Sequence, residues 1–382
     1  GGYFFEMNGY AGSDPVNFRS NHSNPITVHS PDEKGITPEQ LDYIKAHFNK
    51  MESRVYSTDY RNRETGYRSM LDLDSFLKYF LSCEFSGNTD MLWQVFMYKK
   101  RGDDHVYTGP VWDADLALEN DHAVYPGNQR EDWTYTIRCA GNWGNFVSRI
   151  LSDAGAMDRL QTIWAELRDK EIFTSESIQQ YVDSLRLLVD ASQRLNFIRW
   201  PYLNQKIHNN PKVWGSWKAE VDNVRNYVGE RVKWMDKKLH YNMLDMADGV
   251  YQITTPLELV SFSRLVNNGQ TDAKAVLTAD MDFSDYTATF YPIGSLDNVF
   301  TGTIDGQYHT LSNLHLEGEE NVGLIWCLGL RASVSNLFLD ATCSMKGQRY
   351  VGGLVGYAKG GAPNIKCCGS AATVEATVDF AG

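Results

Sequence analysis

The sequence predicts an α+β chain of two domains: a largely helical domain over residues 1–244 and a right-handed parallel β-helix, or β-solenoid, over residues 245–382. The length of 382 residues exceeds the usual size of a single domain. The composition changes near Asp245, because nine of the ten Trp precede it while sixteen of the 31 Gly follow it. Helical periodicity dominates the first part, and short β-runs punctuated by Gly dominate the second.

The bulk composition narrows the classes of partner. A net charge of −12 argues against nucleic acid and anionic membrane, because both attract basic surfaces. No apolar stretch is long enough to span a bilayer. The six Cys lack any C-x-x-C spacing, so we expect no zinc site. The chain starts without Met or a signal peptide and stops directly after a strand-like run, so we expect a fragment cut at both ends.

The first helix is predicted to begin at Thr37. Thr37 can cap it, Pro38 suits its first position, and Gln40 completes a capping box. One apolar stripe follows at helical spacing, made of Leu41, Ile44, Phe48, Met51 and Val55.

A second helix is predicted from Asp74 to Phe85, ending before Gly87. Trp93–Lys99 and His105–Val111 are predicted to pair as a β-hairpin. Four further helices are expected to pack as a helical subdomain, over residues 144–153, 155–170, 175–198 and 216–243.

Two acidic residues flank the predicted hairpin. Asp90 and Asp113 lie 23 positions apart, so their carboxylates can converge on one cleft. There, one could orient a hydroxyl while the other holds a metal ion against phosphate. Turn formation is the plain alternative for each Asp, and a hydrolase using them as acid and base is another. Asp115 is a weaker candidate, because a continuing strand would point it away from Asp113.

The second domain contains an internal repeat. Asn313 and Asn336 follow similar short runs and lie 23 residues apart, and Asn364 follows 28 residues later. Val322 and Val351 begin similar Val-Gly runs at an offset of 29. A period in the twenties, with short strands and Gly turns, is typical of a stacked solenoid. A capping helix is predicted over Glu258–Asn267, with Leu259, Phe262 and Val266 turned inward.

The first part of the chain, over roughly residues 1–240, resembles the spore coat protein H (CotH) kinase family of atypical secreted or surface protein kinases. The resemblance depends on an ordered series of segments, namely Gly1–Glu6, Asp72–Phe80, Glu84, Gly87–Asp90 and Tyr107–Ala117. It implies an atypical protein-kinase-like domain, mostly the helical C-lobe with the N-lobe truncated. The phosphate-anchoring Lys and any glycine-rich loop would then lie upstream of Gly1.

The resemblance also implies site residues and cofactors. Asp90 falls at the position of the catalytic-loop Asp and Asp113 at that of the metal-binding Asp, with ATP and Mg²⁺ as cofactors. Family members often carry an Asn a few residues after the catalytic Asp, where it serves as a second metal ligand. Here only Gln94 lies near that position, so it would be a substitute ligand with looser geometry. Trp112 would flank the nucleotide base, or else be a buried core Trp.

Glu84 and Asn88 are expected to position the loop that carries Asp90, and Asn88 is also a candidate contact for the cofactor. The alternative for Glu84 is an ion pair on the helix face. The alternative for Asn88 is a cap at the C-terminal end of the helix.

The second part, from about Tyr251, resembles the GLUG-type Gly-rich repeats of bacterial surface proteins, most clearly in Phe300–Gly306 and Val351–Gly356. The pairing implies a secreted or cell-surface bacterial protein, with its signal peptide outside this fragment. The expected function is transfer of the ATP γ-phosphate to Ser or Thr of an extracytoplasmic protein, by a kinase displayed on the solenoid. The alternative is a non-catalytic pseudokinase scaffold whose solenoid binds a glycan or a surface protein.

Overall fold

The computed structural model describes residues 2–122, 129–137, 139–207, 210–286, 290–360 and 363–381. The chain clusters into two compact units. The first comprises Gly1–Ile163 and Leu167–Met235, and the second comprises Trp164–Glu166 and Asp236–Gly382. Among the described residues, no helix combines the length and the apolar content that a bilayer crossing requires.

The first unit is built on a five-stranded antiparallel sheet with the strand order β2-β3-β1-β4-β5. Its strands are β1 (Tyr3–Asn8), β2 (Asn17–Arg19), β3 (Pro25–Ser30), β4 (Gln94–Lys99) and β5 (Val106–Thr108). Central β1 buries Phe5 fully, and the Phe5 ring meets Phe48 of α1 (Pro38–Tyr56) edge-on, with the ring centroids 5.9 Å apart. The predicted hairpin is confirmed in β4 and β5, although its second strand ends early, at Thr108.

The two predicted helix starts have clear chemical causes. Thr37 and Gln40 form the expected capping box at the start of α1. Helix α2 (Leu73–Ser86) begins at a cap from Asp72 and ends at Gly87, whose φ of 62° is left-handed. A Cβ on Gly87 would lie 2.4 Å from the Tyr227 hydroxyl, so only glycine fits this end of the helix.

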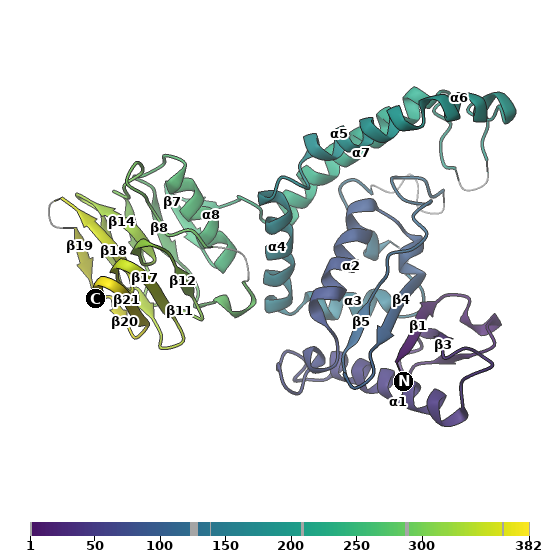
Figure 1. Ribbon diagram of the computed structural model, residues 1–382, viewed down its shortest axis with the longest axis horizontal. Coiled ribbons are helices and arrows are strands. Elements are labelled where there is room, and N and C mark those ends of the chain that lie inside the picture. The colour runs from purple at the N-terminus through teal and green to yellow at the C-terminus, as the bar shows by residue number, and fades with distance from the viewer. Residues whose placement is uncertain are drawn as a thin grey trace. The chain divides into compact units, whose positions relative to one another are not determined.

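The later helices differ in part from the prediction. They are α3 (Trp143–Leu151), α4 (Ala154–Asp169), α5 (Ser175–Leu188), α6 (Asp190–Arg199) and α7 (Trp217–Lys238). The single helix predicted over residues 175–198 is two helices, because the backbone leaves helical geometry at Val189. Helices α5 and α7 lie side by side with α6 at the far end, forming an arm (Figure 1). Neither α5 nor α6 buries a residue, so the expected helical subdomain is only partly packed.

Short 3₁₀ turns complete the regular structure: η1 (Ala11–Ser13), η2 (Tyr67–Ser69), η3 (Asp90–Leu92) and η4 (Thr134–Thr136) in the first unit, and η5 (Phe283–Asp285) in the second.

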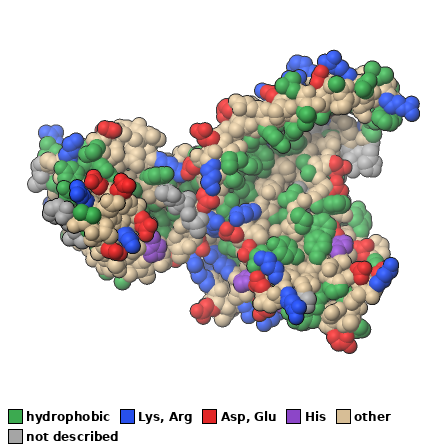
Figure 2. All heavy atoms as spheres, in the orientation of Figure 1, with side chains coloured by type: hydrophobic (Ala, Val, Ile, Leu, Met, Phe, Trp, Pro, Cys, Tyr) green, Lys and Arg blue, Asp and Glu red, His purple; other side chains and the backbone are tan. Residues whose placement is uncertain are grey.

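Apolar side chains gather along the arm of α5 and α6 (Figure 2), including Leu188, which is 80% exposed.

The second unit contains a parallel β-solenoid of about three turns. Its strands are β6 (Asp245–Ala247), β7 (Val250–Ile253), β8 (Lys274–Leu277), β9 (Met281–Asp282), β10 (Thr303–Asp305), β11 (Thr310–Ser312), β12 (His315–Glu317), β13 (Glu320–Val322), β14 (Ile325–Gly329), β15 (Ser333–Ser335), β16 (Phe338–Leu339), β17 (Ser344–Val351), β18 (Val355–Lys359), β19 (Asn364–Lys366), β20 (Gly369–Ser370) and β21 (Thr373–Ala381). Helix α8 (Pro256–Asn267) packs against this core and buries Leu259, Phe262 and Val266 as predicted.

The register of the solenoid corrects the predicted repeat. The offset of 29 is confirmed, because Val322 pairs with Val351. The offsets of 23 and 28 through Asn336 are wrong. Strand β15, which ends just before Asn336, pairs Val334 with Ile304 on one side and with Ile365 on the other, so Asn336 aligns with neither Asn313 nor Asn364. Asn313 and Asn336 therefore occupy two different corners rather than successive copies of one corner.

The two corners share one local chemistry, which explains the mistaken alignment. Asn313 and Asn336 have left-handed φ values of 56° and 54°, which Asn tolerates better than most residues. Each side-chain amide donates to an Asp of the preceding turn, Asn313 to Asp282 at 2.8 Å and Asn336 to Asp305 at 2.9 Å. Each Asn thus stabilises a bend and also connects neighbouring turns.

We predict that Asn336→Ala destabilises the second unit more than Asn336→Gly does. Both variants lose a hydrogen bond of about 1 kcal/mol. Only Ala adds the cost of a left-handed backbone, roughly 1–2 kcal/mol. Urea unfolding monitored by hydrogen exchange of the β10 and β15 amides measures the difference. Equal destabilisation by the two variants would show that the backbone bend does not matter.

Candidate functional site

Three carboxylates converge at the end of the β4–β5 hairpin. Asp90, Asp113 and Asp115 each offer an oxygen, and these atoms all lie within 4.8 Å of one another. Asp90 opens η3 directly after α2, whereas the other two follow β5. Oxygen ligands of Mg²⁺ or Ca²⁺ lie about 2.0–2.6 Å from the ion, so ligands of one ion lie at most about 5 Å apart. The three carboxylates fit that limit.

The electrostatics of this acidic cluster favour a cation. Burial raises the pKa of Asp90, and the negative charges of Asp113, Asp115 and Asp121 raise it further. Burial also raises the pKa of Asp113, with Asp115 as the second cause. Like charges held this close repel one another, and a divalent ion among them would relieve the repulsion. The donor set therefore suits Mg²⁺.

The expectation that Asp115 points away from Asp113 is wrong. It assumed that the strand continues through both residues, but β5 ends at Thr108. Asp113 has a left-handed φ of 51°, so the chain bends there and both side chains reach the same point. Strand alternation does not apply after the end of a strand.

Asn88 connects the two segments that carry the acidic cluster. Its Oδ1 accepts from the backbone N–H of Asp90 at 3.1 Å, and its Nδ2 donates to the backbone carbonyl of Asp113 at 2.8 Å. The Asn88 side chain is fully buried, whereas its partners Asp90 and Asp113 are half-buried and exposed. The helix cap is Gly87 rather than Asn88. Asn88 is thus a positioning residue here, and contact with a cofactor stays a prediction.

Gln94 and Trp112 bind each other beside the cluster. The Trp112 indole N–H donates to Oε1 of Gln94 at 3.1 Å, and the indole meets Phe96 of β4 edge-on. Trp112 is 49% exposed, so the alternative of a buried core Trp is wrong. Its exposed surface is available to a nucleotide base. One lone pair of Gln94 Oε1 is used by Trp112, which leaves the other for a metal ion or water.

Glu84 does form an ion pair, as its alternative predicted, but the pair is buried and its partner is Arg231 of α7. Its carboxylate accepts from the backbone N–H groups of Thr134 and Tyr135 and lies 3.2 Å from the guanidinium of Arg231. Both charged side chains are completely buried. Burial raises the pKa of Glu84 to about 7, against the opposing effect of Arg231 and the two N–H groups.

Sequence reasoning missed Arg231 and its neighbour Tyr227 on α7. Arg231 donates twice to the backbone carbonyl of Glu84, and Tyr227 donates to that of Phe85. These bonds add side-chain partners to carbonyls at the C-terminal end of α2, where intrahelical partners run out; the Glu84 carbonyl also accepts from the Gly87 N–H. A signal was present, because Arg231 interrupts the buried stripe of α7 between Val228 and Val232.

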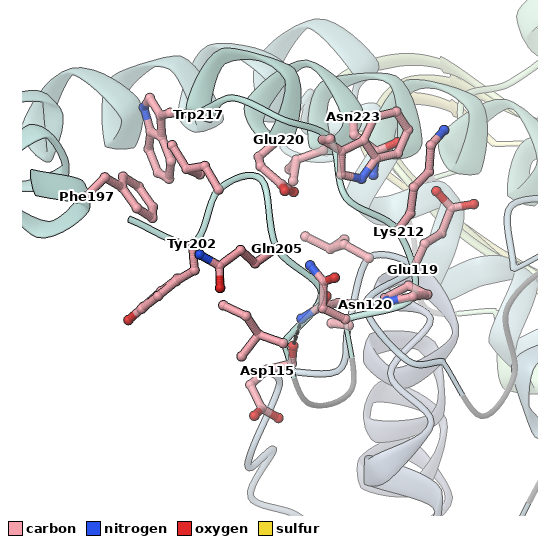
Figure 3. Close-up of a pocket in the computed structure, with 18 of the residues that line it drawn as sticks. Asp115, Glu119, Asn120, Phe197, Tyr202, Gln205, Lys212, Trp217, Glu220 and Asn223 are labelled. Carbon is pink, nitrogen blue, oxygen red and sulfur yellow. Dashed lines mark hydrogen bonds between the residues drawn. The ribbon is translucent and has the colours of Figure 1, made fainter. Parts of the chain in front are cut away.

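A cavity of about 410 Å³ adjoins the acidic cluster (Figure 3). Asp115 belongs both to the cluster and to the cavity lining. The cavity lies between the segment 114–120 and described parts of the segment 197–224, which runs from the end of α6 to the first turns of α7. No strand of the sheet contributes a lining residue.

Comparison with known proteins gives one family match. The family model described as CotH kinase protein matches residues 2–235, more than half of the chain. A separate segment comparison finds Halomucin of Haloquadratum walsbyi, 36% identical over 84 residues, which is 21% of this chain and 1% of that protein. No solved structure matches.

We predict that Asp113→Asn stabilises the metal-free protein at neutral pH but removes its response to Mg²⁺. A raised carboxyl pKa means that the ionised cluster opposes folding at pH 7, and this cost disappears as the pH falls and the group protonates. The gain is roughly 0.2–1 kcal/mol, the scale of exposed charge pairs. Thermal unfolding with and without Mg²⁺ measures both effects.

Asp42→Asn on exposed α1 is the matched control, and it should change neither quantity. An Asp113→Asn protein that Mg²⁺ stabilises as much as the wild type would contradict a cation site at the cluster.

We predict that Asn88→Ala lowers the unfolding free energy by roughly 1–3 kcal/mol, because the backbone groups of Asp90 and Asp113 lose a shielded partner. It should also weaken Mg²⁺ binding although no cluster carboxylate is removed. Calorimetric titration measures the affinity, and Asn145→Ala on the exposed face of α3 is the control. Unchanged affinity would mean that Asn88 does not position the carboxylates.

Proposed function

This chain belongs to the CotH kinase protein family, and we propose that it is an atypical protein kinase that transfers the ATP γ-phosphate to Ser or Thr of an extracytoplasmic protein. The observation that carries the proposal is the convergence of Asp90, Asp113 and Asp115 on one point. Phosphoryl transfer requires mainly positioning and charge stabilisation, and a metal-binding carboxylate beside a second Asp provides for both.

Each carboxylate has a separate role in this proposal. Asp90, fixed by Asn88, accepts a hydrogen bond from the acceptor hydroxyl and orients it toward the γ-phosphate. Asp113 and Asp115 would hold Mg²⁺, which when bound neutralises phosphate charge. Asp90 is half-buried, whereas the other two are exposed, which matches a base that is shielded and ligands that face the entering nucleotide.

Gln94 and Trp112 complete the nucleotide side. Trp112 offers its exposed ring to the base, and the bond from its indole to Gln94 fixes the ring orientation. The remaining lone pair of Gln94 Oε1 would serve as a secondary metal ligand.

The second unit serves display rather than catalysis in this proposal. The Gly-rich turns and stacked strands fit a GLUG-type solenoid on a secreted or cell-surface bacterial protein. Such a solenoid would bind a glycan or another surface protein and so hold the kinase near its substrates.

One observation favours a second candidate, a pseudokinase scaffold. Gln94 already accepts a hydrogen bond from Trp112, so the secondary metal ligand is weakened. A scaffold would keep the fold and the acidic cluster but transfer no phosphate.

Transfer of labelled phosphate tests the proposal, using the natural polypeptide with whatever segments flank residues 1–382. We expect Asp90→Asn to lower kcat by at least about 100-fold, the lower range for loss of a general base. Asp113→Asn should also lower kcat, because it removes a ligand of Mg²⁺. Asp42→Asn should match the wild type.

Nucleotide binding separates the two candidates. For a kinase, Mg²⁺-dependent ATP binding should survive in Asp90→Asn and be lost in Asp113→Asn. Equal labelling by all proteins, or no labelling at all by the wild type, would rule out the kinase.

A further inference from the structure

The cavity beside Asp115 has the chemistry of a cation subsite. Its walls carry several aromatic rings together with two carboxylates that are not in the acidic cluster, namely Phe197, Tyr202, Trp214, Trp217, Glu119 and Glu220. Aromatic faces attract cations through their quadrupole, and a carboxylate adds direct charge attraction. The two carboxylates, however, differ in whether they already have a partner.

Glu119 is neutralised within the protein, and Glu220 is not. Arg130 makes two hydrogen bonds to Glu119, at 2.9 and 2.6 Å. Across the described ranges, Glu220 has no cation within ion-pair distance. Lys212 also lines the cavity, but its Nζ lies 3.7 Å from the centre of the Trp214 ring and is engaged there.

The Glu220 carboxylate points into the cavity (Figure 3). Burial raises its pKa, and only a backbone N–H of Trp214 opposes that shift. A half-buried carboxylate that has no cation beside it can pair with a cationic group of a ligand, and that pairing would favour its ionised form. Gln205 also lines the cavity and adds an amide to its polar groups.

The location of the cavity identifies the side from which the ligand comes. Trp112 and Gln94, the proposed nucleotide contacts, bind each other and do not line the cavity. The cavity meets the cluster at Asp115. Attacking and leaving oxygens are roughly in line across the transferred phosphoryl group, so nucleotide and acceptor approach from opposite sides. A cavity that meets the cluster but holds none of the proposed nucleotide contacts fits the acceptor better than the nucleotide.

We propose that this cavity binds an arginine side chain of the acceptor polypeptide at a fixed spacing from the phosphorylated residue, with Glu220 as the specificity-determining residue. The inference rests on the kinase function proposed above. A planar guanidinium can stack on an aromatic wall and donate two parallel hydrogen bonds to the carboxylate. Lysine, with a compact ammonium group, matches this combination less well.

Peptides that carry one Ser, with a single Arg moved through each flanking position, test the proposal. We expect one Arg position to raise kcat/KM about tenfold or more over the all-Ala peptide, mainly through KM, as for a charge-assisted hydrogen bond. Lys at that position should give a smaller gain. Glu220→Gln should remove the preference while the all-Ala peptide reacts as with the wild type.

Two further variants make the test specific. Glu64→Gln, an exposed carboxylate elsewhere in the first unit, should keep the Arg preference. Glu220→Lys should invert the preference, so that a peptide with Glu in place of Arg becomes the better substrate. This inversion cannot arise from misfolding alone.

Direct binding separates this inference from the kinase proposal. Calorimetry with the preferred Arg peptide and its Ala counterpart needs no phosphate transfer. Glu220-dependent binding by a protein that transfers no phosphate would support the subsite and contradict the kinase proposal. Phosphate transfer without any Arg preference would contradict the subsite and leave the kinase proposal standing. A Glu220→Gln protein with altered KM for ATP and unaltered KM for peptide would assign the cavity to the nucleotide and overturn the inference.

Discussion

The position of the acidic cluster depends on one buried cation. Arg231 binds the Glu84 carboxylate, the Glu84 carbonyl and the carbonyl of Asp132, so it joins α7 to the end of α2 and to the segment before η4. Gly87 and Asp90 follow shortly after Glu84 in the chain. Removing one partner of a buried pair costs about 3–5 kcal/mol, because the other charge is left uncompensated. The pair therefore fixes where α2 ends, and hence where Asp90 begins.

The site carries energetic costs that a purely structural end of a hairpin would avoid. Asp113 adopts a left-handed backbone. Three carboxylates crowd together, and the pKa values of Asp90 and Asp113 are raised by burial and further by the neighbouring negative charges. Asn88 offsets part of this cost by bonding both segments, yet it cannot neutralise the charge. Strain and repulsion that persist in a folded chain are typical of functional sites, where a ligand completes the arrangement.

Local chemistry was predictable from the sequence, and long-range convergence was not. The capping box at Thr37 and the helix stop at Gly87 were predicted because a few adjacent residues determine them. Asp115 was misjudged because the end of β5 is set by tertiary pairing. The repeat offset through Asn336 was predicted wrongly because two different corners of the solenoid carry the same local sequence, an Asn after a short strand. Arg231 interrupts the buried stripe of α7, but its partner Glu84 could not be identified, because it lies 147 positions earlier and no periodicity connects the two.

Helix α7 links the two ends of the proposed reaction. It carries Glu220 in the cavity and Arg231 at the base of the loop that holds Asp90, about 16 Å apart along the helix axis at 1.5 Å per residue. Asn223, between them, accepts from Arg130, the same side chain that neutralises Glu119. Because a packed helix does not stretch, the distance from the cation subsite to Asp90 is set by the fold. An acceptor would then be selected by the spacing between its arginine and its hydroxyl, and not by net charge alone.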